Sequence, residues 1–205
     1  RFATDVGLVQ RSPLVEDLEA TCDLLDRKPC DDRDIVERLA AKLQKLDCSV
    51  AVADISPLGL VAAARTGVPS VLVENFTWDW IYLNYPDGTS RLRQHGRRMV
   101  EIFASANLRI QTTPMCEPLP TAVNVGPVAR SPRSGREAIR ASLGVPSDEP
   151  MIVASMGGVP WNYGDFAGFD HSDGVWVVVP GGAEGEIHHR GRFLLLPFHS
   201  GYYHP

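Results

Sequence analysis

The stretch CSVAVADISPLGLVAAARTGVPSVLVEN, residues 48–75, contains an almost complete strand–helix–strand unit. Its two ends, CSVAVADI and SVLVEN, are nearly continuous apolar runs, which is typical of parallel strands that are buried on both faces. Between them, PLGLVAAART predicts a helix that ends at Gly67, with Pro69 just beyond it. This order of elements predicts a parallel β-sheet with helices packed against it.

The sequence on either side continues this alternation. Two amphipathic helices are expected between Pro13 and Asp47, where apolar residues recur at helical spacing, and the acidic run at 31–34 suits a helix N-terminus. After residue 75 we expect a short helix at TWDWIYLNY, a longer one at RLRQHGRRMVEIFASA, and strands at LRIQT and AVNVG. The alternation predicts an α/β fold of Rossmann-like parallel sheets with helices on both faces.

A change of composition divides the chain. Segment 130–150 is rich in Pro, Ser and Arg around one short helix, and the strand pattern restarts at MIVASM. Domain boundaries fall in such segments, so we expect a first Rossmann-like domain over residues 1–147, nearly complete but without its first strand. The rest, 148–205, is the start of a second domain, with strands at MIVASM, VWVVVPGG and RFLLLP. About 55 residues make a poor independent core, so we expect this carboxy-terminal domain to be truncated.

Composition narrows the classes of partner and compartment. The 20 basic and 25 acidic residues give a net charge of −5, which argues against a generally positive surface for nucleic acid. The 4 cysteines form no CxxC pair, which favours reduced thiols in a cytoplasmic protein. No apolar run approaches the ~20 residues that span a bilayer, so no membrane span is expected. The oligomeric state is not indicated by these features.

Polar residues follow the first two predicted strands. Asp54 ends the first strand, and Asn75, Thr77 and Asp79 follow the second. Ligands of open parallel sheets bind beyond the carboxyl ends of the strands, so these side chains are candidates for a binding or catalytic site. The alternative is that residues here only cap the following helices, around 56–57 in one case and through Asn75 or Thr77 in the other.

Two tryptophans lie in the second of these segments. Trp78 and Trp80 are two residues apart, so on a helix they point in different directions and at least one is free to face a cleft. Aromatic rings flanked by carboxylates and amides suit sugars, which stack their C–H faces on rings and hydrogen bond through their hydroxyls. The alternative is a buried tryptophan whose indole N–H is bonded locally.

The second domain offers glycine pairs and a histidine behind its strands. Gly157 and Gly158 follow MIVASM, and Gly181 and Gly182 follow VWVVV. Paired glycines let the backbone approach a ligand, and N–H groups at such turns bind phosphate, although each pair is more often a plain turn. His199 follows RFLLLP, where an imidazole can contact a base, a ribose or a phosphate; the alternative is a solvated loop residue.

These segments carry a family resemblance. VAVADISPLGLVAAARTGVPSVLVENFTWDWIY, PVAR, REAIRASLG and MIVASMGG resemble bacterial glycosyltransferase-like proteins of the GT-B type, which have two Rossmann-like domains. The element NFxWDxIY also occurs in the amino-terminal part of plant arabinokinases. The resemblance covers most of the chain, and its most specific pieces are NFTWDWIY and ADISP.

The resemblance implies that the two domains bind different substrates. The first domain would bind the acceptor and the second a nucleotide-sugar donor, with the active site in the cleft between them. Asn75, Thr77 and Trp78 would bind the acceptor, and Asp79 or Asp54 would act as the general base. The two glycine pairs and the histidine named above would bind the donor.

The expected function is therefore that of a glycosyltransferase with a nucleotide-sugar and a sugar acceptor as partners. No cofactor or metal is expected, because a helix dipole and backbone amides can stabilise the donor pyrophosphate. His188 and His189 are adjacent in a predicted exposed loop and lack the spacing of a zinc site. The alternatives are a sugar- or nucleotide-binding module without turnover, and an inactive fragment.

Overall fold

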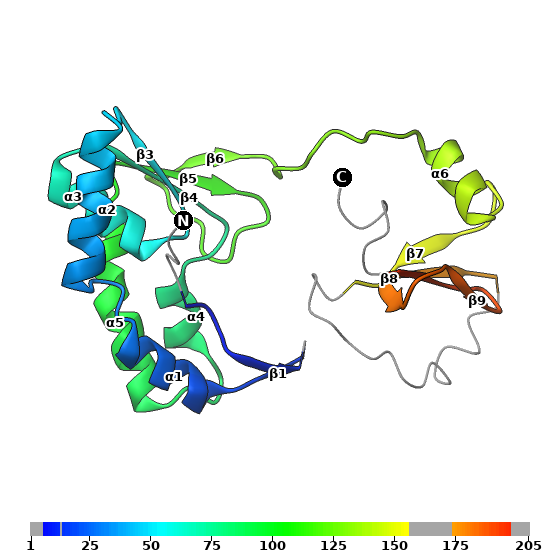
Figure 1. The fold of residues 1–205 in the computed structure, drawn as a ribbon, viewed down its shortest axis with the longest axis horizontal. Coiled ribbons are helices and arrows are strands. Elements are labelled where there is room, and N and C mark those ends of the chain that lie inside the picture. Colours follow the sequence, from blue (N-terminus) through cyan, green and yellow to red (C-terminus); the bar gives the residue numbers. More distant parts are fainter. Residues whose placement is uncertain (1–5, 13, 156–173, 198–205) are drawn as a thin grey trace. The chain divides into compact units, whose positions relative to one another are not determined.

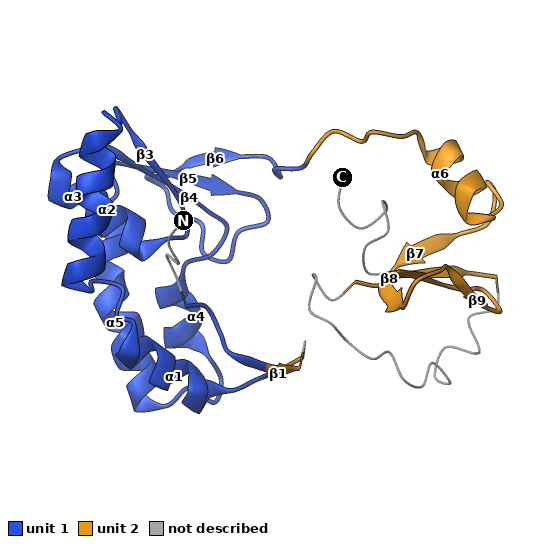
Figure 2. Ribbon diagram, in the orientation of Figure 1, with its two compact units in different colours: residues 1–10, 16–129 blue, residues 11–15, 130–205 orange. Residues whose placement is uncertain are grey.

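The computed structural model describes residues 6–12, 14–155 and 174–197. The chain divides into two compact units, residues 1–10 with 16–129 and residues 11–15 with 130–205 (Figure 2). The division lies between Ala129 and Arg130, so helix α6 (Arg136–Leu143) belongs to the second unit. The sequence pattern placed these residues in the first domain, 1–147. Mixed α/β structure with parallel strands is present in both units, as the sequence predicted.

The first unit contains a four-stranded sheet in the order β3-β4-β5-β6, and all neighbouring strands are parallel (Figure 1). The strands are β3 (Ala51–Asp54), β4 (Ser70–Glu74), β5 (Leu108–Thr112) and β6 (Val123–Val125). Each lies where the sequence predicted a strand. The register pairs Asp54 with Val73 and Glu74 with Gln111, so the carboxyl ends of β3, β4 and β5 lie at one edge of the sheet.

Five helices of the first unit agree closely with the predicted segments. They are α1 (Leu18–Arg27), α2 (Arg33–Lys45), α3 (Pro57–Thr66), α4 (Trp78–Asn84) and α5 (Ser90–Ala104). Asp32, from the acidic run at 31–34, caps α2 by accepting from the backbone N of Ile35 at 3.0 Å. Gly67 ends α3 in the left-handed conformation, with φ of 72°, as the sequence predicted. None of the helices in the described residues is long and apolar enough to cross a membrane.

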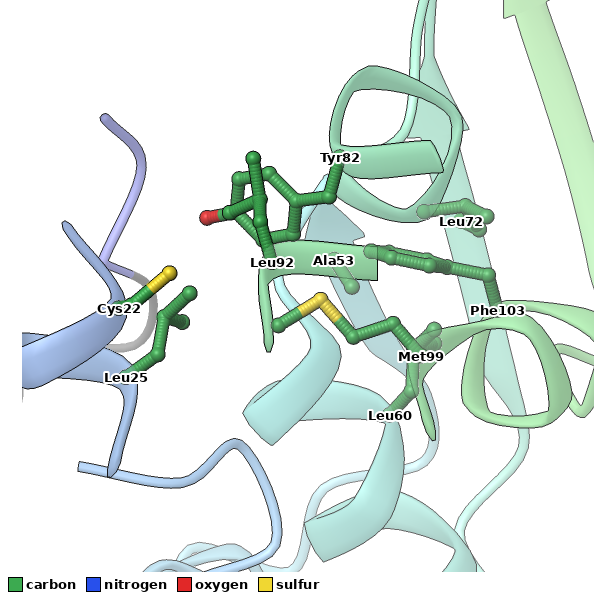
Figure 3. Packing of buried hydrophobic residues seen from close by; sticks show 9 residues of the cluster. All are labelled: Cys22, Leu25, Ala53, Leu60, Leu72, Tyr82, Leu92, Met99 and Phe103. Carbon is green, nitrogen blue, oxygen red and sulfur yellow. The ribbon is translucent and has the colours of Figure 1, made fainter. Parts of the chain in front are cut away.

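The core of this unit lies on one face of its sheet. Ala53 and Leu72 from the strands pack with apolar side chains of four helices (Figure 3), which are Cys22, Leu25, Leu60, Tyr82, Leu92, Met99 and Phe103. The expectation of helices on both faces, and of a fully buried first strand, was wrong for the described residues. Val52 lies on the other face, in the outer strand β3, where it pairs with Val71 of β4. Its exposed fraction is 69%.

The second unit contains a smaller sheet in the order β7-β8-β10-β9. Its strands are β7 (Met151–Val153), β8 (Trp176–Ala183), β9 (His188–Arg190) and β10 (Phe193–Pro197). The histidine pair of β9 is exposed as predicted, but it forms a strand antiparallel to β10 rather than a loop. Helix α6 packs on this sheet through Leu143, beside Val178 and Leu194.

The two short strands near the amino terminus form a separate pair. They are β1 (Gln10–Ser12) and β2 (Val15–Glu16), which the sequence pattern did not predict as strands. The backbone N of Asp17 donates to the carbonyl of Val9 at 2.7 Å, which closes this turn just before α1.

Candidate functional site

Three strand ends of the first sheet are tied together by backbone hydrogen bonds. The N–H of Ile55, just after β3, donates to the carbonyl of Val73 at 3.2 Å. The N–H of Cys116, in the connection after β5, donates to the carbonyl of Asn75 at 2.8 Å. The structure therefore brings the segments that follow β3, β4 and β5 to one edge, which is where open parallel sheets bind ligands.

Asp54 lies at this edge with an exposed side chain. Helix α3 is capped by Ser56, whose hydroxyl accepts from the N–H of Gly59 at 3.2 Å, so the capping expected around 56–57 is confirmed. Because Ser56 performs this role, the carboxylate of Asp54 is not used as the cap. The intervening Ile55 has φ of 42°, which costs a β-branched residue on the order of 1–3 kcal/mol.

The start of α4 contributes the next group of predicted site residues. Thr77 has the backbone conformation of an N-cap and is buried, but its side chain makes no capping hydrogen bond. Asn75 is exposed, and its backbone carbonyl is held by Cys116 as described above. The alternative that Thr77 serves only as a helix cap is therefore not supported.

Trp78 is held firmly against the core of the first unit. Its ring stacks on Tyr82 with centroids 5.8 Å apart, and it meets Phe76 edge-on at 5.3 Å. A Cβ on Gly7 would lie 3.3 Å from Cη2 of the indole, so the chain at Gly7 packs closely against the ring. Trp80 is half-buried and lies outside this core cluster, in agreement with the expectation that the two indoles point in different directions.

Two polar atoms in this turn are buried without a partner. Among the described residues, Trp78 Nε1 and Asp79 Oδ1 are shielded from solvent and form no hydrogen bond. The alternative of a locally satisfied indole is therefore wrong for Trp78.

A buried polar network lies next to the site, and the sequence pattern did not predict it. Glu74 is 4% exposed and its Oε1 accepts from Arg109 Nε at 2.9 Å and Gln111 Nε2 at 2.7 Å. Gln111 also donates to the carbonyl of Glu117 at 2.9 Å and accepts from the N–H of Leu119 at 2.7 Å. These bonds fix the connection after β5 at the carboxyl edge of the first sheet. The available signal was a charged residue that closes an apolar strand, Glu74.

The glycine pair at 181–182 has a structural explanation. Strand β8 continues through both residues, where the register with β10 shifts between Leu196 and Pro197. Gly181 has φ of 75°, and a Cβ on Gly182 would lie 3.1 Å from Val179 Cγ1, so the bulge itself favours glycine at both positions. The glycine pair therefore lies within a bulged strand end and not in a plain turn.

The other residues predicted to bind the donor, Gly157, Gly158 and His199, lie outside the described residues. In the described part of the chain, no group of three or more His, Cys, Asp or Glu side chains is arranged to hold a metal ion.

A charged cluster in the second unit lies away from the carboxyl ends of its strands. Glu149 accepts from Trp176 Nε1 at 2.6 Å and from Arg192, and these two contacts lower the pKa of its carboxyl group. Trp176 begins β8 and Arg192 immediately precedes β10, so the cluster lies at the amino ends of these strands. It links the strands there and is not part of the candidate site.

Comparisons with known proteins give one distant relative. No protein-family model matches the chain, and no solved structure matches it. The chain is 29% identical over 168 residues to a protein of Arabidopsis thaliana named L-arabinokinase, and the matched region covers 77% of this chain. The chain spans 16% of the length of that relative. The shared sequence thus connects this α/β chain with one portion of a sugar-modifying enzyme.

Proposed function

We propose that this protein is a glycosyltransferase-like protein that transfers a sugar from a nucleotide-sugar donor to an acceptor hydroxyl. The observation that supports the proposal is that Asp54 ends β3 and that Asn75 and Asp79 follow β4, so these polar residues come after two neighbouring parallel strands at the same edge of the sheet. Hydroxyl groups donate to carboxylates and accept from amides, and sugar C–H faces pack on aromatic rings. The edge therefore suits an acceptor sugar.

The chemistry follows from these groups. In an inverting reaction, Asp79 or Asp54 takes the proton of the acceptor hydroxyl while its oxygen forms a bond to the anomeric carbon of the donor. The bond from that carbon to the donor phosphate oxygen breaks, and the nucleoside diphosphate leaves with the electron pair. Backbone N–H groups would stabilise the charge that develops on this leaving group.

A second candidate is a binding module that recognises a sugar or nucleotide without turnover. The similarity to one portion of a much longer L-arabinokinase favours it, because a recognition unit and a kinase can share one chain. Both candidates place a ligand at the carboxyl edge of the first sheet. They differ in whether a product forms.

Calorimetric titration of the intact chain with UDP-, GDP- and dTDP-sugars, with L-arabinose as a trial acceptor, separates the candidates. Heat together with a glycosylated product supports the transferase, whereas heat without product supports the binding module. No heat with any donor or with the free sugar would contradict both. Under the transferase proposal, Asp79→Asn or Asp54→Asn removes turnover, while Asp87→Asn, an exposed carboxylate just beyond α4, leaves it unchanged.

A further inference from the structure

Gln111 is a buried polar side chain whose amide forms hydrogen bonds at both ends. It lies in β5 and is 1% exposed. Its Nε2 donates to Glu74 Oε1 at 2.7 Å and to the carbonyl of Glu117 at 2.9 Å, while its Oε1 accepts from the N–H of Leu119 at 2.7 Å. The carboxylate of Glu74 can only accept, which fixes the orientation of the amide. Loss of this amide would therefore leave several partners unbonded.

The segment that these bonds hold is an exposed connection and not part of the core. Residues 113–119 follow β5, and only 115 and 119 among them are half-buried. None of the seven residues packs in the hydrophobic cluster of the first unit. Ordering a backbone costs conformational entropy, which apolar burial repays in a core but not in this connection. Its order therefore depends on hydrogen bonds, and Gln111 makes two of them.

The connection held by Gln111 also holds the segment after β4. The N–H of Cys116 donates to the carbonyl of Asn75 at 2.8 Å, and both residues are exposed. An exposed hydrogen bond gains little by itself, because water competes for both of its groups. It adds most where the backbones are already held in place, and Glu117, the next residue after Cys116, is held by Gln111. The bonds of Gln111 therefore support the position of the Asn75 backbone.

Stability alone does not account for a polar side chain at this place. The same face of the neighbouring strand β4 is filled by Leu72, so an apolar residue could fill the position in β5. A buried polar network that is fully bonded specifies one arrangement of its surroundings. Here the arrangement that it specifies is the connection at the carboxyl end of a parallel strand, where such sheets bind ligands. An ordered connection at this edge lowers the entropic cost of binding.

We propose that Gln111 is a positioning residue of the candidate site, which orders residues 113–119 and, through Cys116, the backbone of Asn75. Gln111 does not contact the ligand, because its side chain is buried. The inference rests on the proposed function for the place of the ligand. It adds the connection after β5 as a part of the site that is ordered before the ligand binds.

Amide hydrogen exchange of the intact chain tests this ordering without a ligand. Gln111→Met keeps the approximate size of the side chain and removes its hydrogen bonds. The N–H groups of Cys116 and Leu119 should then exchange about tenfold faster or more, whereas that of Leu72 in the centre of the sheet should change little. Asn124→Met is the matched control, because this exposed residue lies opposite Gln111 in β6. Unchanged rates at Cys116 and Leu119, or an equal acceleration at Leu72, would overturn the inference.

Gln111→Glu provides a second variant with nearly the same shape. It places a second carboxylate against Glu74, beside Arg109, so the exchange at Leu119 should be faster than in the unmodified chain at neutral pH. The difference should shrink as the pH falls, because one of the two carboxyls then takes up a proton and donates to the other. A loss of stability alone gives no such recovery in acid. A difference that stays constant or grows in acid contradicts the assigned role.

Titration with the UDP-, GDP- and dTDP-sugars separates this inference from the proposed transfer. Gln111→Met should weaken the binding of any sugar nucleotide that the unmodified chain binds by about tenfold, and Asn124→Met should not. Unchanged affinity in Gln111→Met overturns the inference and leaves the transfer standing. If none of these compounds produces heat with the unmodified chain, the proposed transfer fails, and the exchange rates still decide whether Gln111 orders this edge.

Discussion

At the scale of single residues, Tyr82 links the candidate site to the core. Its side chain is fully buried within the core cluster, its ring supports Trp78, and its hydroxyl holds the carbonyl of Gly7. The position of the Trp78 indole therefore depends on both the ring and the hydroxyl of Tyr82. The two contributions can be separated, because phenylalanine keeps the ring.

We expect Tyr82→Phe to lower the free energy of unfolding by about 0.5–1.5 kcal/mol, because the partly buried hydrogen bond to the carbonyl of Gly7 is lost. Denaturant unfolding monitored by circular dichroism measures this loss. Tyr85→Phe, a half-buried tyrosine just beyond α4, is the control and should change stability by less than about 0.5 kcal/mol. Equal losses in the two variants would show that the bond to Gly7 contributes nothing.

At the scale of elements, the carboxyl ends of α2 and α3 differ in the residue that takes the left-handed conformation. Gly67 ends α3 with φ of 72°, whereas Asp47, just after α2, has φ of 49° without being glycine. An aspartate there is unfavourable twice, since its Cβ disfavours the left-handed region and its charge lies near the negative end of the helix dipole. The end of α2 is therefore less stable than it would be with glycine at position 47.

Asp47→Gly should raise the free energy of unfolding by about 0.5–1 kcal/mol, since glycine adopts a positive φ without steric cost. The midpoint of thermal unfolding measures the gain. The reciprocal variant Gly67→Asp should lower that midpoint, because it installs the unfavourable residue at the end of α3. A lower midpoint for Asp47→Gly would mean that the aspartate makes a stabilising contact.

Helices α1 and α5 are joined by charged side chains. Arg91 Nε donates to Asp26 at 3.0 Å, and Arg91 also pairs with Asp23 at 2.8 Å. His95 Nε2 lies 2.9 Å from the other carboxylate oxygen of Asp26. The hydrogen bond from Arg91 lowers the pKa of Asp26 below its ordinary value of 3.8, so the paired carboxylate favours the folded state.

This shift predicts the direction of an acid effect. The stabilising contribution of Asp26 is complete above its unfolded pKa near 3.8 and is lost as the pH falls through its lower folded pKa. Asp26→Asn should therefore destabilise the protein at neutral pH and flatten the fall of stability in acid. Unfolding measured between neutral and acidic pH in the two proteins checks this. Parallel pH profiles would contradict the assignment, and the effect should shrink in high salt because the pair is exposed.

At the scale of the whole chain, the first unit buries only one face of its sheet in helices. Leu72 lies on the covered face and is fully buried, whereas Val52, Leu108, Val123 and Val125 on the other face are 38–69% exposed. Parallel sheets are usually covered on both faces. The two faces should therefore respond differently to truncation of their apolar side chains.

Leu72→Ala should cost about 2–5 kcal/mol, since it removes packed methyl groups from the core. Val52→Ala should change stability by less than about 0.5 kcal/mol, because that side chain is largely in water. Chemical denaturation of both variants gives the comparison. A loss at Val52 as large as that at Leu72 would mean that the outer face is covered in solution.

The sequence predicted the order and type of most elements because each has a strong local signal. The segment at 57–66 begins with a proline and is flanked by a capping serine and a terminating glycine, and α3 has these bounds. Local pattern does not reveal which strand is at an edge, so it misjudged β3, whose apolar run resembles that of a buried central strand. The bulge at 181–182 was missed for a similar reason, since it depends on the register with β10.

The candidate site was predictable in part. Strand-end position identified Asp54, Asn75 and Asp79, because parallel strands place their carboxyl ends together. The partners of Glu74 depend on pairing between β4 and β5, residues more than thirty positions apart, so no local pattern shows them. The unbonded indole of Trp78 likewise depends on the distant chain at Gly7.

The central claim is that a sugar-bearing ligand binds at the carboxyl edge of the first sheet. Backbone amide shifts of the intact chain, followed during titration with a nucleotide-sugar or free sugar that produces heat, test it most directly. We predict shifts concentrated in the segments after β3, β4 and β5, namely residues 54–56, 75–79 and 112–119. Shifts confined to the amino ends of these strands, with these three segments unmoved, would contradict the account.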